Sequence, residues 1–144
     1  MKHFAILLTF LVLPALTGCG SHPRSAGDVA RAWSAALDRG DDEGAARLFA
    51  PGAQIVQNGS IVLETHGDAL RWNEALPCGG SITSVTLRGA GEVLVVFKLT
   101  QRPRHRCDAP GSKAAALFTV HNGKIVLWHQ TTVPEQNPSA DQVI

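Results

Sequence analysis

The chain has 144 residues, of which 44% are hydrophobic and 17% charged, and its formal net charge is +1. This length and composition predict one globular domain. The near-neutral net charge argues against nucleic acid as a partner. Beyond the first twenty positions no apolar run is long enough to span a bilayer.

The N-terminal residues have the pattern of an export signal. Three residues with a basic character precede an almost wholly apolar run over 4–16, which is shorter than the ~20 apolar residues that a spanning helix needs. The following Leu16-Thr17-Gly18-Cys19 resembles the bacterial lipoprotein signal, in which cleavage precedes a cysteine that carries diacylglycerol. Residues 1–18 are therefore predicted to be a signal peptide, and Cys19 a lipidation site that anchors the exported chain to a bacterial membrane of the cell envelope. The alternative is an ordinary secretory signal with a chance cysteine.

Composition divides the rest of the chain into three parts. Residues 19–27 are polar, with Gly, Ser and Pro, and predict a tether between the membrane and the domain. Residues 28–132 carry the periodic apolar pattern of a folded domain. Residues 133–144 contain two prolines and few apolar side chains, so we expect a loose C-terminal tail.

Cys78 and Cys107 are the two cysteines that lipidation would leave. Because an exported chain meets an oxidising compartment, we expect a disulfide between them. If the turn of the preceding hairpin centres on Ala90, Cys78 falls near the level of Arg102, a short loop away from Cys107. A metal site that also uses His105 is the alternative, but too few further ligands stand at suitable spacing.

Periodicity predicts three helices and a first hairpin. Ser25 and Asp28 resemble a capping box, and the apolar residues that follow at helical spacing are Val29, Trp33, Ala36 and Leu37. A second, short helix is expected after Asp41, with Phe49 turned inward and an end at Pro51-Gly52. Residues 55–57 and 61–63 flank Asn58-Gly59 and predict a hairpin with a tight type I′ turn. A third helix is expected over residues 68–76.

Four longer strands are expected over residues 82–88, 92–101, 114–121 and 124–132, with turns at Gly89-Ala90-Gly91 and Asn122-Gly123. Alternation places one set of residues on the inner face, namely Val93, Val95, Phe97, Leu99, Ala116, Phe118, Val120, Val126, Trp128 and Gln130. The outer face is mixed, which leaves solvent exposure and a homodimer interface as alternatives. Arg102, Arg104 and Arg106 predict a basic, solvated loop, with contact to anionic headgroups as the alternative.

The stretches WSAALDRGDDEGAARLFAPGAQI (residues 33–55) and FTVHNGKIVLWHQ (residues 118–130) resemble the nuclear transport factor 2-like superfamily, and within it the SnoaL-like polyketide cyclase and ketosteroid isomerase group. The resemblance covers roughly residues 27–132. It implies an α+β fold in which a curved antiparallel sheet packs against three helices and forms a cone around a pocket. It supports a fold more than an activity.

Isomerase chemistry in that group needs a carboxylate base, a tyrosine hydroxyl and a protonated acid. The resemblance implies that these roles fall on Gln57, Trp33 and a position near Ala116. Gln57 cannot abstract a proton, and Ala116 cannot donate a hydrogen bond. We therefore expect no catalytic residue, although an isomerase, cyclase or hydrolase with displaced catalytic groups remains the alternative.

The resemblance instead suggests a pocket that holds a small hydrophobic ligand or a module that binds a partner protein. The residues expected around the pocket are Trp33, Gln57, Trp72, Phe97, Phe118, Trp128 and Gln130. The alternative is that the aromatic side chains fill the cone completely. No cofactor or metal is expected, because no phosphate loop, nucleophile elbow or metal motif is present.

Overall fold

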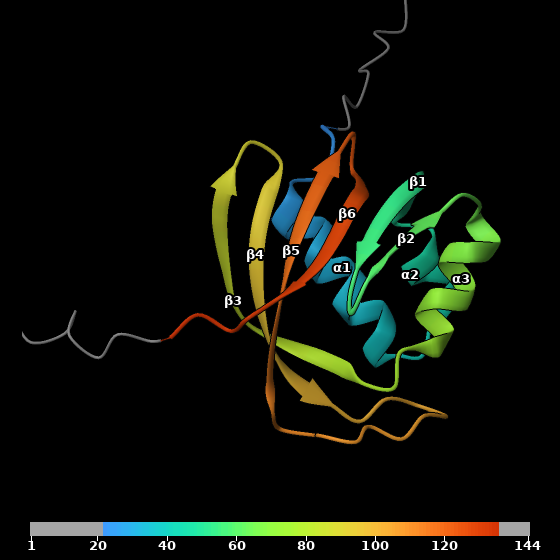
Figure 1. Cartoon of the computed structure of the whole chain (residues 1–144), viewed down its shortest axis with the longest axis vertical. Helices are drawn as coiled ribbons and strands as arrows, with labels where there is room; N and C mark the ends of the chain where they lie inside the picture. Colours follow the sequence, from blue (N-terminus) through green and yellow to red (C-terminus); the bar gives the residue numbers. More distant parts are fainter. Residues whose placement is uncertain (1–21, 136–144) are drawn as a thin grey trace, which may run out of the picture.

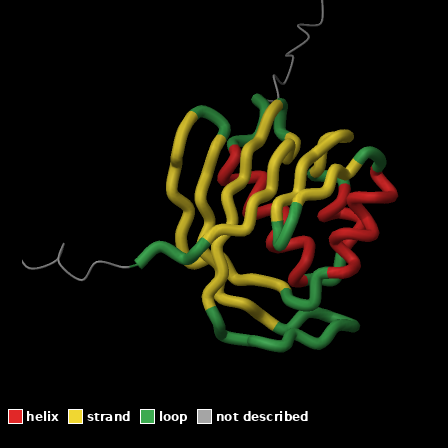
Figure 2. The backbone as a smooth tube through the Cα atoms, in the orientation of Figure 1, coloured by secondary structure: helices red, strands yellow, loops and turns green. Residues whose placement is uncertain are grey.

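The computed structural model describes residues 22–135, which form a curved sheet with helices against its concave side (Figure 1, Figure 2). The helices are α1 (Ala26–Asp38), α2 (Asp42–Ala46) and α3 (His66–Ala75). The strands are β1 (Phe49–Val56), β2 (Ser60–Leu63), β3 (Gly79–Gly89), β4 (Glu92–Thr100), β5 (Lys113–His121) and β6 (Lys124–Thr131). The predicted α+β cone is confirmed.

Helix α1 follows directly from its sequence. Ser25 is the N-cap, and its hydroxyl oxygen accepts a hydrogen bond from the Asp28 backbone N–H at 3.1 Å. Val29 is fully buried and Trp33 is 5% exposed, so the predicted apolar face is the one that packs on the sheet. The helix therefore carries a tryptophan into the centre of the cone.

The second helix is shorter than predicted. It ends at Ala46, and Phe49 begins strand β1 instead of closing the helix. Phe49 pairs with Ile125, and the register between β1 and β6 then shifts before Gln54. Pro51 lies within this irregular stretch, where a residue without a backbone N–H is tolerated in a strand.

The sheet order is β2-β1-β6-β5-β4-β3. Neighbouring strands are antiparallel with one exception, since β1 and β6 run parallel. The expectation of a purely antiparallel sheet is therefore wrong at this pair. A parallel pair requires a long crossover, and here α3, β3, β4 and β5 all lie between the two strands in the chain.

Two turns show how far local sequence sets the geometry. Asn122 and Gly123 have φ values of 49° and 72°, and the two-residue turn predicted there joins β5 to β6. The Asn58-Gly59 turn is longer than predicted, because the last ladder pair is Val56 with Ser60. Gln57 therefore lies outside the β1–β2 ladder.

The inner face of the sheet is correctly predicted on β4 and β5, where Val93, Val95 and Phe118 are fully buried. It is wrong at the start of β6. The register shifts between Thr119 and Val120, so that Val120 pairs with Ile125, and Ile125 enters the core in place of Val126. A bulge of this kind moves the side chains on one side of it to the opposite face.

The C-terminal end of the described chain borders a groove on the outer face of β3 and β4. Val133 to Glu135 line this groove together with Leu94 and Val96. Leu94 is 6% exposed, although it stands on the face predicted to be outside. The predicted homodimer through this face stays a prediction. The predicted signal peptide, Cys19 and the last nine residues lie outside the described residues.

Candidate functional site

A cavity of about 170 Å³ opens on the concave side of the sheet. Strands β3, β4, β5 and β6, helix α1, the segment between α3 and β3, and Gln57 in the β1–β2 turn supply its walls. Its wall residues are mostly apolar and include Leu37, Leu76, Pro77, Phe97, Leu99 and the three alanines of residues 114–116. The cone is therefore neither empty nor completely filled.

The structure brings most of the predicted pocket residues together. Those that line the cavity are Trp33, Gln57, Phe97, Trp128 and Gln130. Phe118 is fully buried and does not line it, and its ring centroid lies 5.4 Å from that of Trp33. Trp72 also packs against Trp33 and Trp128, with ring centroids 6.2 and 5.1 Å away. Phe118 and Trp72 thus support the wall from behind.

Ala114 and Ala115 of β5 are among the wall residues that the sequence pattern does not place at the pocket, whereas Ala116 is predicted on the inner face. Ala115 and Ala116 are 2% and 1% exposed, and Ala114 is half-buried. Ala116 pairs with Val95 on one side and Gln130 on the other. A run of small residues in a central strand, between large neighbours, is a signal for open space that the aromatic pattern did not reveal.

Trp33 is committed to an internal hydrogen bond. Its Nε1–H donates to Asn73 Oδ1 at 2.8 Å, and Asn73 is fully buried on α3. The Asn73 amide nitrogen in turn donates to the Ala69 carbonyl oxygen at 2.8 Å. The indole N–H is therefore unavailable to a guest in the cavity, and Trp33 contributes an apolar ring surface only.

The three positions to which the resemblance assigns isomerase roles all lie at this cavity, since Trp33, Gln57 and Ala116 line it. Among the described residues that form its wall, none is Asp, Glu, His, Lys or Arg. The wall therefore offers ring surfaces, aliphatic groups and amides, and within residues 22–135 it presents no side chain that exchanges protons near neutral pH.

The acidic and basic groups near α3 serve the helix and its surroundings. Thr65 and Asp68 form a capping box, and hydrogen bonds from the Thr65 hydroxyl and backbone hold the pKa of the Asp68 carboxyl below its ordinary value. His66 Nε2 lies 2.9 Å from Glu43 Oε1, at an exposed position. These side chains do not line the cavity.

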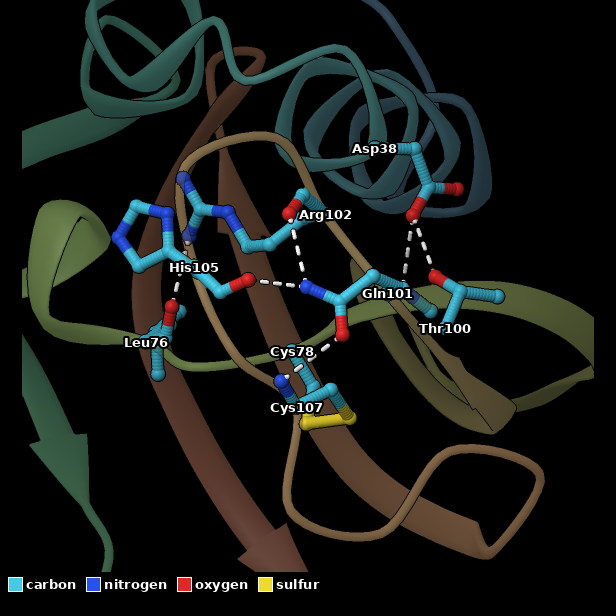
Figure 3. Close-up of a disulfide and its surroundings, with 9 residues drawn as sticks. Asp38, Leu76, Cys78, Thr100, Gln101, Arg102, His105 and Cys107 are labelled. Carbon is cyan, nitrogen blue, oxygen red and sulfur yellow. Dashed lines mark hydrogen bonds between the residues drawn. A yellow bond between two sulfur atoms is a disulfide. The ribbon is translucent and has the colours of Figure 1, made fainter.

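The predicted disulfide between Cys78 and Cys107 is present, with 4.6 Å between the Cα atoms (Figure 3). Cys78 itself lines the cavity. Next to it, Gly79 lies so close to α1 that an added Cβ would be 2.1 Å from Asp38 Oδ1. Asp38 accepts hydrogen bonds from the Gly80 N–H at 3.0 Å and the Thr100 hydroxyl at 2.8 Å. The disulfide end of the sheet is thus tied to the helix that carries Trp33.

The loop after β4 is not the solvated basic segment that its composition predicts. Arg102 is only 2% exposed, and its guanidinium bonds to Asp42 of α2. It also donates to the backbone carbonyl oxygens of Asn73 and Leu76, each at 2.9 Å. Figure 3 shows Arg102 in the segment that leads from Thr100 to the disulfide at Cys107. Arg104 and Arg106 are exposed, as predicted.

This loop lies at the C-terminal end of α1, where Arg104 donates to the Gly40 carbonyl oxygen at 3.1 Å. The described part of the chain begins at the opposite, N-terminal end of α1, beside the β5–β6 turn (Figure 1). The loop is therefore far from the point at which the predicted tether joins the domain.

Solved structures resemble this chain closely in fold. They include a putative polyketide cyclase from Sinorhizobium meliloti, with a TM-score of 0.59 and 19% identity over 72% of this chain and 94% of that one. An NTF2-like protein from Cytophaga hutchinsonii has a TM-score of 0.61 and 12% identity over 77% and 92% of the two chains. A putative ketosteroid isomerase from Kribbella flavida has a TM-score of 0.55 and 17% identity over 83% and 87%.

The chain has the nuclear transport factor 2-like fold. At these identities the likeness concerns the NTF2-like fold alone. No protein-family model matches the chain, and no curated protein matches it.

Within residues 22–135 no group of three or more His, Cys, Asp and Glu side chains is placed to hold a metal ion. No helix in that range is long and apolar enough to cross a membrane.

Proposed function

We propose that this chain is a lipid-anchored envelope protein whose NTF2-like domain binds a small apolar molecule and does not transform it. The observation that carries the binding role is the cavity, a space of about 170 Å³ with a mostly apolar wall. An engineered apolar cavity of ~150 Å³ holds benzene or xenon. The cavity of this chain therefore suits a guest with one ring or a short aliphatic chain, and it is below the ~300–1,000 Å³ of pockets for larger ligands.

The non-catalytic role is supported by the composition of the wall. Proton abstraction requires a base within hydrogen-bonding reach of the guest. The position that the resemblance assigns to the base is Gln57, and the position assigned to the acid is Ala116. An amide and a methyl group cannot perform those steps. The S. meliloti and K. flavida structures are described as a putative cyclase and a putative isomerase, and those activities are not carried over to this chain.

Binding is tested on the mature chain, residues 19–144, with Cys19→Ser so that no acyl chain competes for the cavity. This form retains every described helix and strand. We expect toluene to stabilise it, by about 1.4 kcal/mol at ten times the dissociation constant. The matched control is Ala116→Leu, which places a larger side chain in the cavity and should abolish the stabilisation by toluene. Equal stabilisation of both proteins would place the toluene elsewhere and contradict the proposal.

Catalysis is tested with a guest that fits, such as 3-cyclohexenone, whose conversion to the conjugated enone raises ultraviolet absorbance. We expect no acceleration over buffer. Acceleration by the unsubstituted chain that Ala116→Leu removes would show proton transfer in the cavity and would overturn the non-catalytic part of the proposal.

Anchoring is tested separately, by mass spectrometry of the full chain purified from bacterial membranes. We expect a mature protein that begins at Cys19 and carries the mass of a diacylglyceryl group, because Leu16-Thr17-Gly18-Cys19 resembles the signal at which bacterial lipoproteins are cleaved and lipidated. Cys19→Ser should abolish this product. An N-terminus at another residue, or an unmodified Cys19, would contradict the anchor.

A further inference from the structure

Gln57 and Gln130 both line the cavity. Strands β1 and β6 are parallel, and their ladder ends with Ile55 opposite Trp128 and Val56 opposite His129. Gln57 and Gln130 are the residues that directly follow this last pair in the sequence, and Gln57 begins the turn between β1 and β2, where its backbone N–H donates to the Gly59 carbonyl oxygen at 2.9 Å. Gln130 stands two residues after the buried Trp128 on β6 and shares its face, and Gln57 reaches the same cavity from the turn.

The two side-chain amides are free to bind a guest. Neither forms a hydrogen bond with any other described residue, and both residues are exposed, which places them where the cavity meets solvent. Each amide has one acceptor oxygen and two N–H donors. Of the other polar side chains of the wall, Ser34 donates to the Gly80 carbonyl oxygen and Trp33 donates to Asn73. The Nε1–H of Trp128 is buried and has no partner among the described residues.

The same wall disfavours a charged guest. No Asp, Glu, His, Lys or Arg among the described residues lines the cavity, so an ion that entered would lose water without gaining an opposite charge. A neutral group keeps its hydrogen bonds if it meets the amides, and a group with both a donor and an acceptor can use both sides of the pair. The volume of about 170 Å³ limits the rest of the guest to about one ring.

We propose that Gln57 and Gln130 form a paired-amide clamp that selects neutral, single-ring molecules with one terminal group that both donates and accepts hydrogen bonds, such as an aromatic primary amide. The ring lies against Trp128 and Phe97, and the terminal group faces the glutamines. This inference deepens the proposed function and rests on it, because the clamp matters only if the cavity binds a guest.

The test compares four probes of one shape on the mature Cys19→Ser chain at pH 7 by isothermal titration calorimetry. They are benzamide, toluene, benzoate and benzylammonium. We expect benzamide to bind about tenfold more tightly than toluene, which corresponds to one or two net hydrogen bonds. The two ions should bind at least tenfold more weakly than benzamide.

The variants separate the clamp from the cavity. Gln57→Leu with Gln130→Leu should reduce benzamide affinity to that of toluene, while toluene affinity is retained. The matched control is Gln54→Leu, because Gln54 is an exposed glutamine of β1 that bonds to Ser60 at 2.8 Å and does not line the cavity. It should leave all four affinities unchanged. Gln57→Glu should raise benzylammonium affinity at least tenfold, and this gain cannot come from a protein that has failed to fold.

The outcomes distinguish the two proposals. Toluene binding without a preference for benzamide, or a preference that survives both leucines, overturns the clamp and leaves the cavity as the binding site. Benzoate binding as tight as benzamide overturns the selection against charge. Failure of both toluene and benzamide to bind overturns the clamp together with the proposed function.

Discussion

Replacing Arg102 by methionine should destabilise this fold more than any surface substitution. The guanidinium is bonded to Asp42, which is 9% exposed, and to two backbone carbonyl oxygens. Methionine fills part of the space but leaves the Asp42 carboxylate buried without a cation, and it removes the donor to the Leu76 carbonyl oxygen. Breaking a buried ion pair by removing one partner costs about 3–5 kcal/mol. A domain of this size is stable by about 5–15 kcal/mol in total, so Arg102→Met consumes a large part of that margin.

The measurement is urea unfolding of the mature Cys19→Ser chain, followed by the fluorescence of its tryptophans. The matched control is Arg106→Met, since Arg106 is exposed in the same loop and its loss should change the unfolding free energy by about 0.5 kcal/mol or less. Adding Asp42→Asn to Arg102→Met removes the unpaired charge and should recover at least about 1 kcal/mol of the loss. An Arg102→Met chain within 1 kcal/mol of the parent would refute the role assigned to the pair.

Three further predictions concern the disulfide, the tryptophan hydrogen bond and the helix cap. Replacing Cys78 and Cys107 by alanine opens a loop with a sequence separation of 29 and should lower the unfolding free energy by about 3.6 kcal/mol, measured as a shift of the urea midpoint; no shift would contradict this. Asn73→Leu leaves the Trp33 Nε1–H without its acceptor and should cost about 1–3 kcal/mol in the same assay, whereas a neutral result would show that the indole finds another partner. The pKa of Asp68 is lowered in the folded state, so its stabilising contribution is present above the ordinary value of 3.8 and is lost as the pH falls through the folded pKa. Thermal melts between pH 6 and 2 should therefore show a shallower acid loss for Asp68→Asn than for the parent, and identical slopes would refute the linkage.

The sequence predicts those parts of the fold that depend on local periodicity. Val29 and Trp33 stand on one helical face, and that face is buried because a helix with a single apolar stripe has only one stable orientation against a sheet. The pairing of Cys78 with Cys107 follows from the length of one hairpin. Both predictions concern residues that lie close together in the sequence, for which few competing arrangements of the chain exist.

Register is harder to predict, because one irregular residue reverses the faces of a strand. Ile125 and Val126 are both β-branched and apolar, so composition does not decide between them. The shift at Thr119 and Val120 does, and it places Ile125 in the core. The parallel pairing of β1 with β6 is also invisible locally, because it joins segments about seventy residues apart in the chain.

The burial of Arg102 could not be predicted from its neighbours. Arginine is mostly exposed, and Arg104 and Arg106 in the same loop follow that rule. Arg102 departs from it because α2 brings a carboxylate and α3 brings two carbonyl oxygens to one point, and only the tertiary arrangement provides them.

The same reasoning explains why the cone holds a small cavity. The aromatic rings gather around Trp33, whose centroid lies 5.4 Å from Phe118 and 6.0 Å from Trp128, and they fill the interior beside α1 and α3. Where Ala114 and Ala116 face Phe97 and Gln130, methyl groups replace rings and the packing cannot close. Solid core and open pocket, which the sequence left as alternatives, thus occupy different parts of one cone. In the proposed function, the two alanines set the size of the guest and the glutamines that also line the cavity set its polarity. We therefore expect a larger side chain at Ala116 to close the cavity without disturbing the aromatic cluster around Trp33.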